Sequence, residues 1–184
     1  MTTKSKTRYA LLGILSLYPM SGYDLKKFCD EAVSQFWNEN YTHIYSVLKK
    51  LEKEGLAGKI TEQTPGRPQK NVYHVTEKGR AELNEWLLLP VEPDPPRFEL
   101  ILKIVFSTDV PVQNIIEKIE RYKLENEQAL VSVIEGEKKI KSIAGTQGEK
   151  WASLWLIGIN SGKHSYKAVV EWCDETLEIL KGMK

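Results

Sequence analysis

Polar and cationic side chains recur at helical spacing in the segment NYTHIYSVLKKLEK, on the side opposite an apolar stripe. The stripe consists of Ile44, Leu48 and Leu51, which follow one another at i, i+4 and i+7. Small hydroxyl groups let a helix lie deep in a DNA major groove and bond to base edges, while ammonium groups bond to phosphates. The spacing therefore predicts nucleic-acid binding by the side opposite the stripe, made of Thr42, Ser46, Lys49 and Lys53 with His43 and Lys50 beside them.

Two predicted strands and a basic turn follow this helix and must hold it in place. Gly55 is expected to end the helix in the left-handed conformation that glycine favours. The turn between the strands, PGRPQK, carries Arg67 and Lys70 beside two prolines, and such a turn adds nothing to a hydrophobic core. A helix followed by a hairpin with cations at its tip is the layout of a winged helix. Amphipathic helices and hairpins are also common elsewhere, and adjacent lysines often form only a solvated face.

The candidate DNA contacts differ in the groups that they would meet. Thr42, Ser46 and Lys49 are the strongest candidates for base edges. His43, near the start of the helix, is a candidate for a base or phosphate contact, with an ordinary surface position as the alternative. Arg67 is expected at the phosphate backbone but could instead enter a narrow minor groove, which attracts guanidinium groups. The rest of the predicted DNA-binding set is expected at the phosphate backbone or packed beside the helix: Tyr41, Tyr45, Lys50, Lys53 and Lys70.

The N-terminal part frames the candidate helix with further helices. A largely buried first helix is predicted over residues 7–18, and the corner PMSG separates it from a second helix that begins after Ser21 and runs towards Phe36. Asn40 and Thr76 are expected to cap the third and fourth helices. We predict a mainly α fold with a small β-hairpin wing, in which residues 1–88 form a winged helix-turn-helix DNA-binding domain.

The C-terminal part is predicted to be helical throughout and to associate. Residues 89–97 form a proline-rich linker, and residues 98–184 an α-helical dimerisation domain. A short helix should precede a long one from Pro111 with near-heptad apolar spacing, and a break over residues 145–148 should precede a last helix over residues 150–183. The apolar stripe of that last helix is too long for one neighbouring helix to cover. A homodimer is the economical explanation.

The distribution of charge agrees with this division. Residues 1–80 contain 13 Lys and Arg against 8 Asp and Glu, a net charge of +5, and residues 81–184 contain 13 against 17, a net charge of −4. These values combine to the +1 of the whole chain. A basic N-terminal part beside an acidic C-terminal part indicates that the DNA-facing residues lie in the first 80.

The inventory of reactive residues speaks against an enzyme. The three histidines lie in three different predicted elements, and no carboxylate pair, nucleophile motif, phosphate loop or metal-ligand spacing accompanies them. Cys29 and Cys173 are expected to be small buried hydrophobes, so no metal and no cofactor is predicted. No apolar run approaches the length that spans a bilayer, and no signal peptide is evident. We expect a soluble, cytoplasmic protein without a membrane partner.

Three segments together resemble the PadR-like transcriptional regulators: RYALLGILSLYPMSGYDLKKF, IYSVLKKLEKEGLAGK and GRPQKNVYHVTEKGRAELNEWL. Downstream, PPRFELILKIVFS and GKHSYKAVVEWCDETLEIL resemble the helical domain of that family's longer branch, the virulence-activator type. The resemblance implies a regulator, with repression the favoured mode and activation the alternative. It also implies that Tyr45, in the family's IY-x-x-L motif, packs and bonds to a phosphate.

The sequence thus predicts a homodimer that binds double-stranded DNA at a pseudo-palindromic operator. In related regulators effectors bind in apolar space between the helical domain and the DNA-binding domain, or across the dimer. We therefore consider a site for a small aromatic effector lined by Phe98, Tyr122, Trp151 and Trp155, with ordinary core as the alternative for these aromatics. Two rival functions remain. The winged helix could bind another protein instead of DNA, or the chain could bind a small molecule without controlling an operator.

Overall fold

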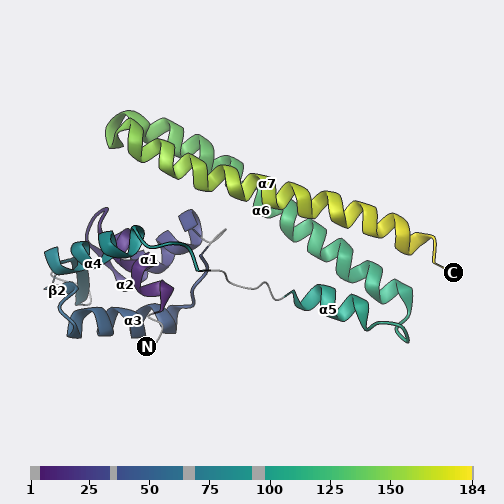
Figure 1. The fold of residues 1–184 in the computed structure, drawn as a ribbon, viewed down its shortest axis with the longest axis horizontal. Helices are drawn as coiled ribbons and strands as arrows, with labels where there is room; N and C mark the ends of the chain where they lie inside the picture. The colour runs from purple at the N-terminus through teal and green to yellow at the C-terminus, as the bar shows by residue number, and fades with distance from the viewer. Residues whose placement is uncertain (1–4, 34–36, 64–68, 93–97, 184) are drawn as a thin grey trace. The chain divides into compact units, whose positions relative to one another are not determined.

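The chain folds into two compact units, Met1–Glu92 and Pro93–Lys184 (Figure 1). The structure is a computed structural model that describes residues 5–33, 37–63, 69–92 and 98–183. The first unit mixes helices with a small antiparallel sheet, and the second is helical. The predicted fold class, mainly α with a β-hairpin wing, is confirmed.

The described residues of the first unit place five helical segments around a three-stranded sheet of order β1-β3-β2. β3 is the central strand, pairing Tyr73 with Met20 on β1 and with Lys59 on β2. The buried core comes mainly from α1 and α3, with Leu11, Leu12, Ile44 and Leu48 fully buried. In chain order the elements are α1 (Lys6–Leu15), β1 (Met20–Ser21), α2 (Gly22–Phe28), the π-helical turn η1 (Cys29–Val33), α3 (Tyr41–Lys53), β2 (Ala57–Glu62), β3 (Lys70–Val75) and α4 (Glu77–Leu87).

Three details of this unit differ from the sequence prediction. The first helix ends at Leu15, not Tyr18, with Ser16 as its C-cap. The second helix changes to a π-helical turn at Cys29. The two residues before α2 pair with β3 as a third strand, which is too short to show a periodic pattern.

The predicted N-caps Ser21, Asn40 and Thr76 and the predicted glycine after α3 are confirmed. Gly55 has φ of 70°, the left-handed conformation expected after α3. Each N-cap oxygen accepts the backbone N–H three residues later, which satisfies an amide that the helix itself leaves free. These bonds run from Asp24 N to Ser21 Oγ at 3.2 Å, from His43 N to Asn40 Oδ1 at 2.8 Å, and from Gly79 N to Thr76 Oγ1 at 3.1 Å.

The second unit is a long antiparallel hairpin of α6 (Val112–Gln147) and α7 (Glu149–Lys181), preceded by the short helix α5 (Glu99–Val105). Lys123 on α6 contacts Asp174 on α7 at 2.6 Å, and Lys163 on α7 contacts Glu137 on α6 at 2.6 Å, so the two helices run side by side for most of their length (Figure 1). The break predicted over residues 145–148 is confined to Gly148, whose φ of 95° makes the turn, and α6 continues through Gly145.

The hairpin core lies near the open end, where Ile119 and Cys173 are fully buried. Leu100 and Ile104 of α5 pack against this cluster. Cys173 and the equally buried Cys29 are free thiols, as expected, and burial raises the pKa of both.

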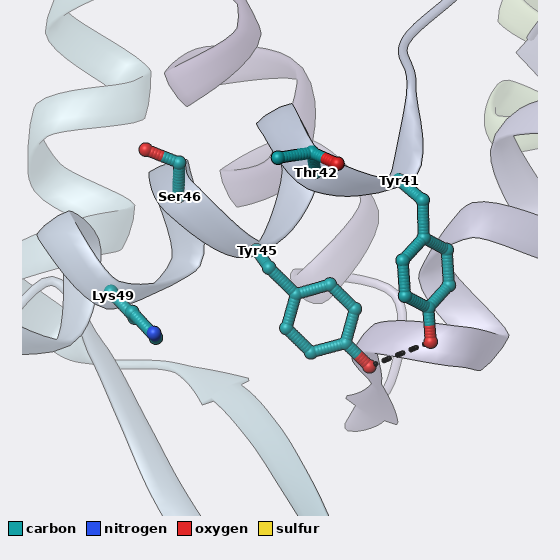
Figure 2. A pocket seen from close by; sticks show the side chains of 5 residues that line it. All are labelled: Tyr41, Thr42, Tyr45, Ser46 and Lys49. Carbon is teal, nitrogen blue, oxygen red and sulfur yellow. Dashed lines mark hydrogen bonds between the residues drawn. The ribbon is translucent and has the colours of Figure 1, made fainter.

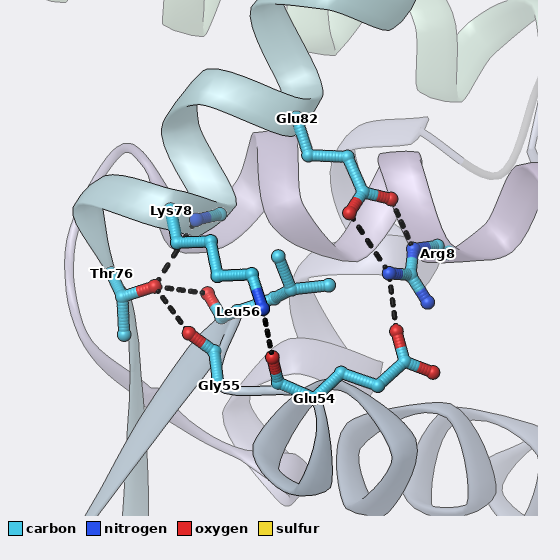
Figure 3. A network of polar contacts seen from close by, with 8 residues as sticks. Arg8, Glu54, Gly55, Leu56, Thr76, Lys78 and Glu82 are labelled. Carbon is cyan, nitrogen blue, oxygen red and sulfur yellow. Dashed lines mark hydrogen bonds and ion pairs between the residues drawn. The ribbon is translucent and has the colours of Figure 1, made fainter.

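A buried arginine ties three helices of the first unit together (Figure 3). Arg8 on α1 bonds twice to the Glu82 carboxylate on α4, at 2.7 and 3.0 Å, and also pairs with Glu54 at the end of α3. Burial opposes the guanidinium charge, but the hydrogen bonds to Glu82 and Glu54 outweigh that cost and raise the pKa of Arg8 above its usual value. Arg8 therefore stays charged at every physiological pH.

Arg8→Ala is expected to destabilise the protein by about 2–4 kcal/mol, because it leaves the half-buried Glu82 carboxylate without its partner. The control is Lys26→Ala, which removes an exposed i,i+4 pair with Asp30 and should cost less than about 0.5 kcal/mol. Urea unfolding followed by circular dichroism measures both. Equal losses in the two variants would show that the Arg8 network does not stabilise the fold.

Candidate nucleic-acid interface

The apolar side of α3 fixes which of its side chains face water. Ile44, Leu48 and Leu51 are fully buried, so the helix cannot rotate about its axis without exposing them. The opposite side is open and carries a shallow depression of about 500 Å³ (Figure 2). The residues that line it are Tyr41, Thr42, Tyr45, Ser46 and Lys49, all of which belong to the predicted DNA-binding set.

The end of α3 is held by the segment TEKG, which begins α4 (Figure 3). The Thr76 hydroxyl donates to the carbonyl oxygens of Gly55 and Leu56, at 2.8 and 3.1 Å, and the Lys78 ammonium donates to the Glu54 carbonyl at 2.9 Å. A Cβ on Gly79 would lie 2.1 Å from the Leu56 carbonyl oxygen, so only glycine fits there. The motif thus satisfies carbonyl groups that the end of a helix leaves unpaired.

Two tyrosines form the rim of the depression at the start of α3. Their rings are 4.8 Å apart, and the hydroxyl groups of Tyr41 and Tyr45 share a hydrogen bond of 3.1 Å (Figure 2). The Tyr45 ring lies directly on the backbone of Gly22, where an added Cβ would approach the ring to 2.4 Å. Burial and the bond to Tyr41 raise the pKa of Tyr45 to about 12, so it remains a neutral phenol.

The lysines of this unit divide into bound and free cations. Lys59 pairs with Glu52 at 2.7 Å, and Lys70 pairs with Asp24 at 2.8 Å. In the part of the chain that the structure describes, no carboxylate pairs with the exposed lysines of α3. These free cations are Lys49, Lys50 and Lys53.

The other predicted site residues have different surroundings. The His43 Nδ1 atom lies 2.5 Å from the Glu39 carboxylate, which also accepts a hydrogen bond from Thr7 on α1. His43 is therefore anchored beside the depression and does not line it. Arg67 lies outside the described residues.

Sequence reasoning missed two residues of this region, Gly22 and Asp24. They stand in the first turn of α2, and nothing in their local pattern distinguishes them from ordinary helix-starting residues. Gly22 matters because Tyr45, 23 positions later, packs on it, and Asp24 because Lys70 reaches it from β3. Only the tertiary fold creates either contact.

The structure does not gather the four predicted effector-binding aromatics within one chain. The ring centroids of Trp151 and Trp155 lie 5.7 Å apart at the start of α7. Tyr122 packs on the cluster that contains Cys173, 18 residues after Trp155, which is about 27 Å along a helix. Phe98 is exposed immediately before α5.

Neither a metal site nor a membrane-spanning helix is found in the described residues. They contain no group of three or more His, Cys, Asp or Glu side chains placed to hold a metal ion. They also include no helix with the length and apolarity to cross a bilayer.

Comparison with known proteins identifies the family. Residues 11–85 match the Transcriptional regulator PadR-like family, and residues 96–181 match the Virulence activator alpha C-term domain. The negative transcriptional regulator PadR of Bacillus subtilis is 32% identical over 131 residues, which cover 70% of this chain and 71% of that protein. The chain belongs to the PadR-like family of transcriptional regulators.

Solved structures of Bacillus subtilis PadR share this fold over nearly the whole chain. The complex of that protein with operator DNA has a TM-score of 0.77 at 25% identity and covers 96% of this chain and 99% of its own. Its complex with p-coumaric acid has a TM-score of 0.69 at 25% identity, covering 95% and 98% of the two chains. The winged-helix architecture of this PadR-like regulator is therefore shown by both sequence and structure.

Proposed function

We propose that this PadR-like regulator represses transcription by binding a pseudo-palindromic operator as a homodimer. The observation that carries the proposal is the open side of α3, where hydroxyl groups and the uncompensated Lys49 line one depression. Base edges need hydrogen-bonding groups that are not already paired, and phosphates need free cations. The Bacillus subtilis relative, a negative regulator, binds operator DNA with the same fold.

The side chains of α3 have separate roles in this proposal. Thr42, Ser46 and Lys49 read base edges from the depression, and Tyr41 and Tyr45 bond to phosphate at its rim. Lys50 and Lys53 meet the phosphate backbone further along the helix, and His43 contacts the DNA beside the helix start. Arg67 and Lys70 are proposed as wing contacts.

Lys49→Ala is expected to weaken binding to the operator by about 1–3 kcal/mol while changing binding to unrelated duplex much less, because a base contact discriminates between sequences. Lys53→Ala is the matched control on the same helix. It should weaken binding to both duplexes similarly and reduce the slope of log affinity against log salt concentration by about 0.9. Fluorescence anisotropy with operator and scrambled duplexes measures both, using operator DNA identified by footprinting upstream of the gene.

The two rival functions make different predictions in that experiment. A module that binds protein would show no salt-dependent affinity for any duplex. A small-molecule binding protein without operator control would bind its ligand with no change in DNA affinity. If Lys49→Ala leaves operator affinity unchanged, the assignment of α3 as the reading helix is wrong.

The apolar surface of α5 supports the homodimer. One side of this seven-residue helix packs on the hairpin core through Leu100 and Ile104, yet Leu102 and Val105 on its other side are 59% and 67% exposed. Phe106, directly after the helix, is 76% exposed. Covering such side chains yields about 1.5–3 kcal/mol each, so a second copy of the chain is the partner that we propose.

Replacing Leu102 and Val105 together by Asp is expected to give a monomer at micromolar concentration, since each copy would have to bury two charges. Operator affinity should fall at least tenfold, because a dimer binds two half-sites at once. The control is Gln113→Asp, a change at an exposed position of α6. Light scattering and anisotropy measure these effects, and a double variant that remains dimeric would exclude α5 from the interface.

We also propose that a small aromatic compound releases the operator, using Trp151 and Trp155 as one wall of its site. The indole N–H of Trp151 is buried without a hydrogen-bond partner among the described residues, so it offers a donor to a ligand oxygen. The Bacillus subtilis relative binds p-coumaric acid, which is planar and carries such oxygens. Phe98 and Tyr122 can join this site only from another copy of the chain or through a rearrangement.

Aromatic acids including p-coumaric acid should therefore quench tryptophan fluorescence and weaken operator binding, about 100-fold if the coupling free energy is 2.7 kcal/mol. The quenching should persist in Trp172→Phe, which lies in the other part of α7, and disappear in the double variant Trp151→Phe, Trp155→Phe. Quenching without release of DNA would make the site incidental. No quenching by any compound would leave these tryptophans as simple core residues.

A further inference from the structure

The only described lysine at the base of the wing is already engaged by a carboxylate. Lys70, the first residue of β3, places its ammonium 2.8 Å from the Asp24 carboxylate. Asp24 stands in the first turn of α2, 46 residues earlier. The two meet because β1 pairs with β3, Ser21 opposite Val72, which brings the start of α2 beside the start of that strand.

The Asp24 carboxylate has two functions at once. Its Oδ2 atom accepts a hydrogen bond of 2.8 Å from the Ser21 hydroxyl and a longer one of 3.4 Å from the Ser21 backbone, which completes the capping box of α2. The same atom holds the Lys70 ammonium. The bonds from Lys70 and Ser21 lower the pKa of Asp24, so it is ionised at neutral pH.

The pair lies beside the proposed DNA surface and in reach of water. The Asp24 charge acts on the Tyr45 phenol, which forms the rim of the depression on α3. The side chains of Lys70 and Asp24 are 51% and 41% exposed. An ion pair so exposed contributes at most about 1 kcal/mol, which a DNA phosphate can overcome.

We propose that Asp24 sets the affinity of this regulator for DNA by competing with the phosphate backbone for the Lys70 ammonium. In the free protein the carboxylate holds the wing cation, and a phosphate must displace it before Lys70 can contribute. The free lysines of α3 can contact phosphates without first displacing a carboxylate. Asp24 thereby weakens binding to every sequence by a similar factor, which limits the time spent on non-operator DNA.

The proposal rests on DNA binding by the wild-type protein and is tested by a double-mutant cycle. Asp24→Asn removes the charge and keeps an oxygen that can accept from Ser21. It should tighten binding to both operator and scrambled duplex by about twofold to fivefold, the range set by an exposed ion pair. The slope of log affinity against log salt should steepen by up to about 0.9, because one more phosphate is contacted.

The decisive comparison is made in the Lys70→Gln background. There Asp24→Asn should have little effect, because no cation is left to release. If Asp24→Asn acted only by removing a negative charge, it would raise the affinity for DNA equally in both backgrounds. That result would overturn the proposal. Glu31→Gln is the charge-matched control, since Glu31 pairs with Lys27 on α2, and it should not change the salt slope.

Two further results separate the possible failures. Asp24→Ser, which removes the carboxylate with a smaller side chain, should show the same coupling to Lys70, and thermal melts monitor folding of each variant. A wild-type protein that binds no duplex would refute the proposed function and this inference with it. A wild type that binds DNA, with no coupling between positions 24 and 70, would refute only the role of Asp24.

Discussion

The orientation of α3 depends on one constraint, the burial of its apolar stripe against the core of the first unit. Ile44, Leu48 and Leu51 have no exposed surface, and rotating the helix by even one residue would bring an apolar side chain into water. Both ends of the helix are also fixed. Asn40 caps its beginning, and Thr76 and Lys78 bond to the carbonyl groups at its end. The side chains opposite the stripe therefore have a defined direction before any ligand binds.

Electrostatics then separates the cations of this unit by function. Arg8 is buried between carboxylates of two other helices and serves the fold. Lys59 is neutralised by Glu52, and Lys70 by Asp24. The lysines of α3 lack such partners among the described residues, so their charges remain free on the exposed surface of that helix.

The helical unit buries its apolar residues less completely within its own chain. Its hairpin is long and narrow, so each helix can bury only one side against the other, and α5 adds a second apolar surface that the hairpin does not cover. Asn126 is buried in the same stripe and bonds to the Tyr122 carbonyl, which keeps a polar group satisfied inside the unit. Such a unit is suited to association because its own chain leaves apolar residues in water.

Local pattern was sufficient to predict the winged helix, the caps and the face of α3 that is exposed. Helical periodicity, cap residues and glycine at positive φ act over a few neighbouring positions, so the sequence carries them directly. The missed strand β1 has a different origin, because it exists only through its pairing with β3, a tertiary contact that no local pattern shows.

The remaining features of the site depend on residues that are far apart in the sequence. The Tyr45 ring needs Gly22, the Lys70 ammonium finds Asp24, and Arg8 pairs with Glu82, 74 positions away. Phe98 and Tyr122 show the converse, because shared aromatic chemistry in the sequence did not bring them to the Trp151–Trp155 pair. The sequence by itself determined which side chains of α3 face water, since periodicity is a local property. Only the tertiary structure decided which charges are neutralised and which remain free to bind, because pairing depends on distances that folding creates.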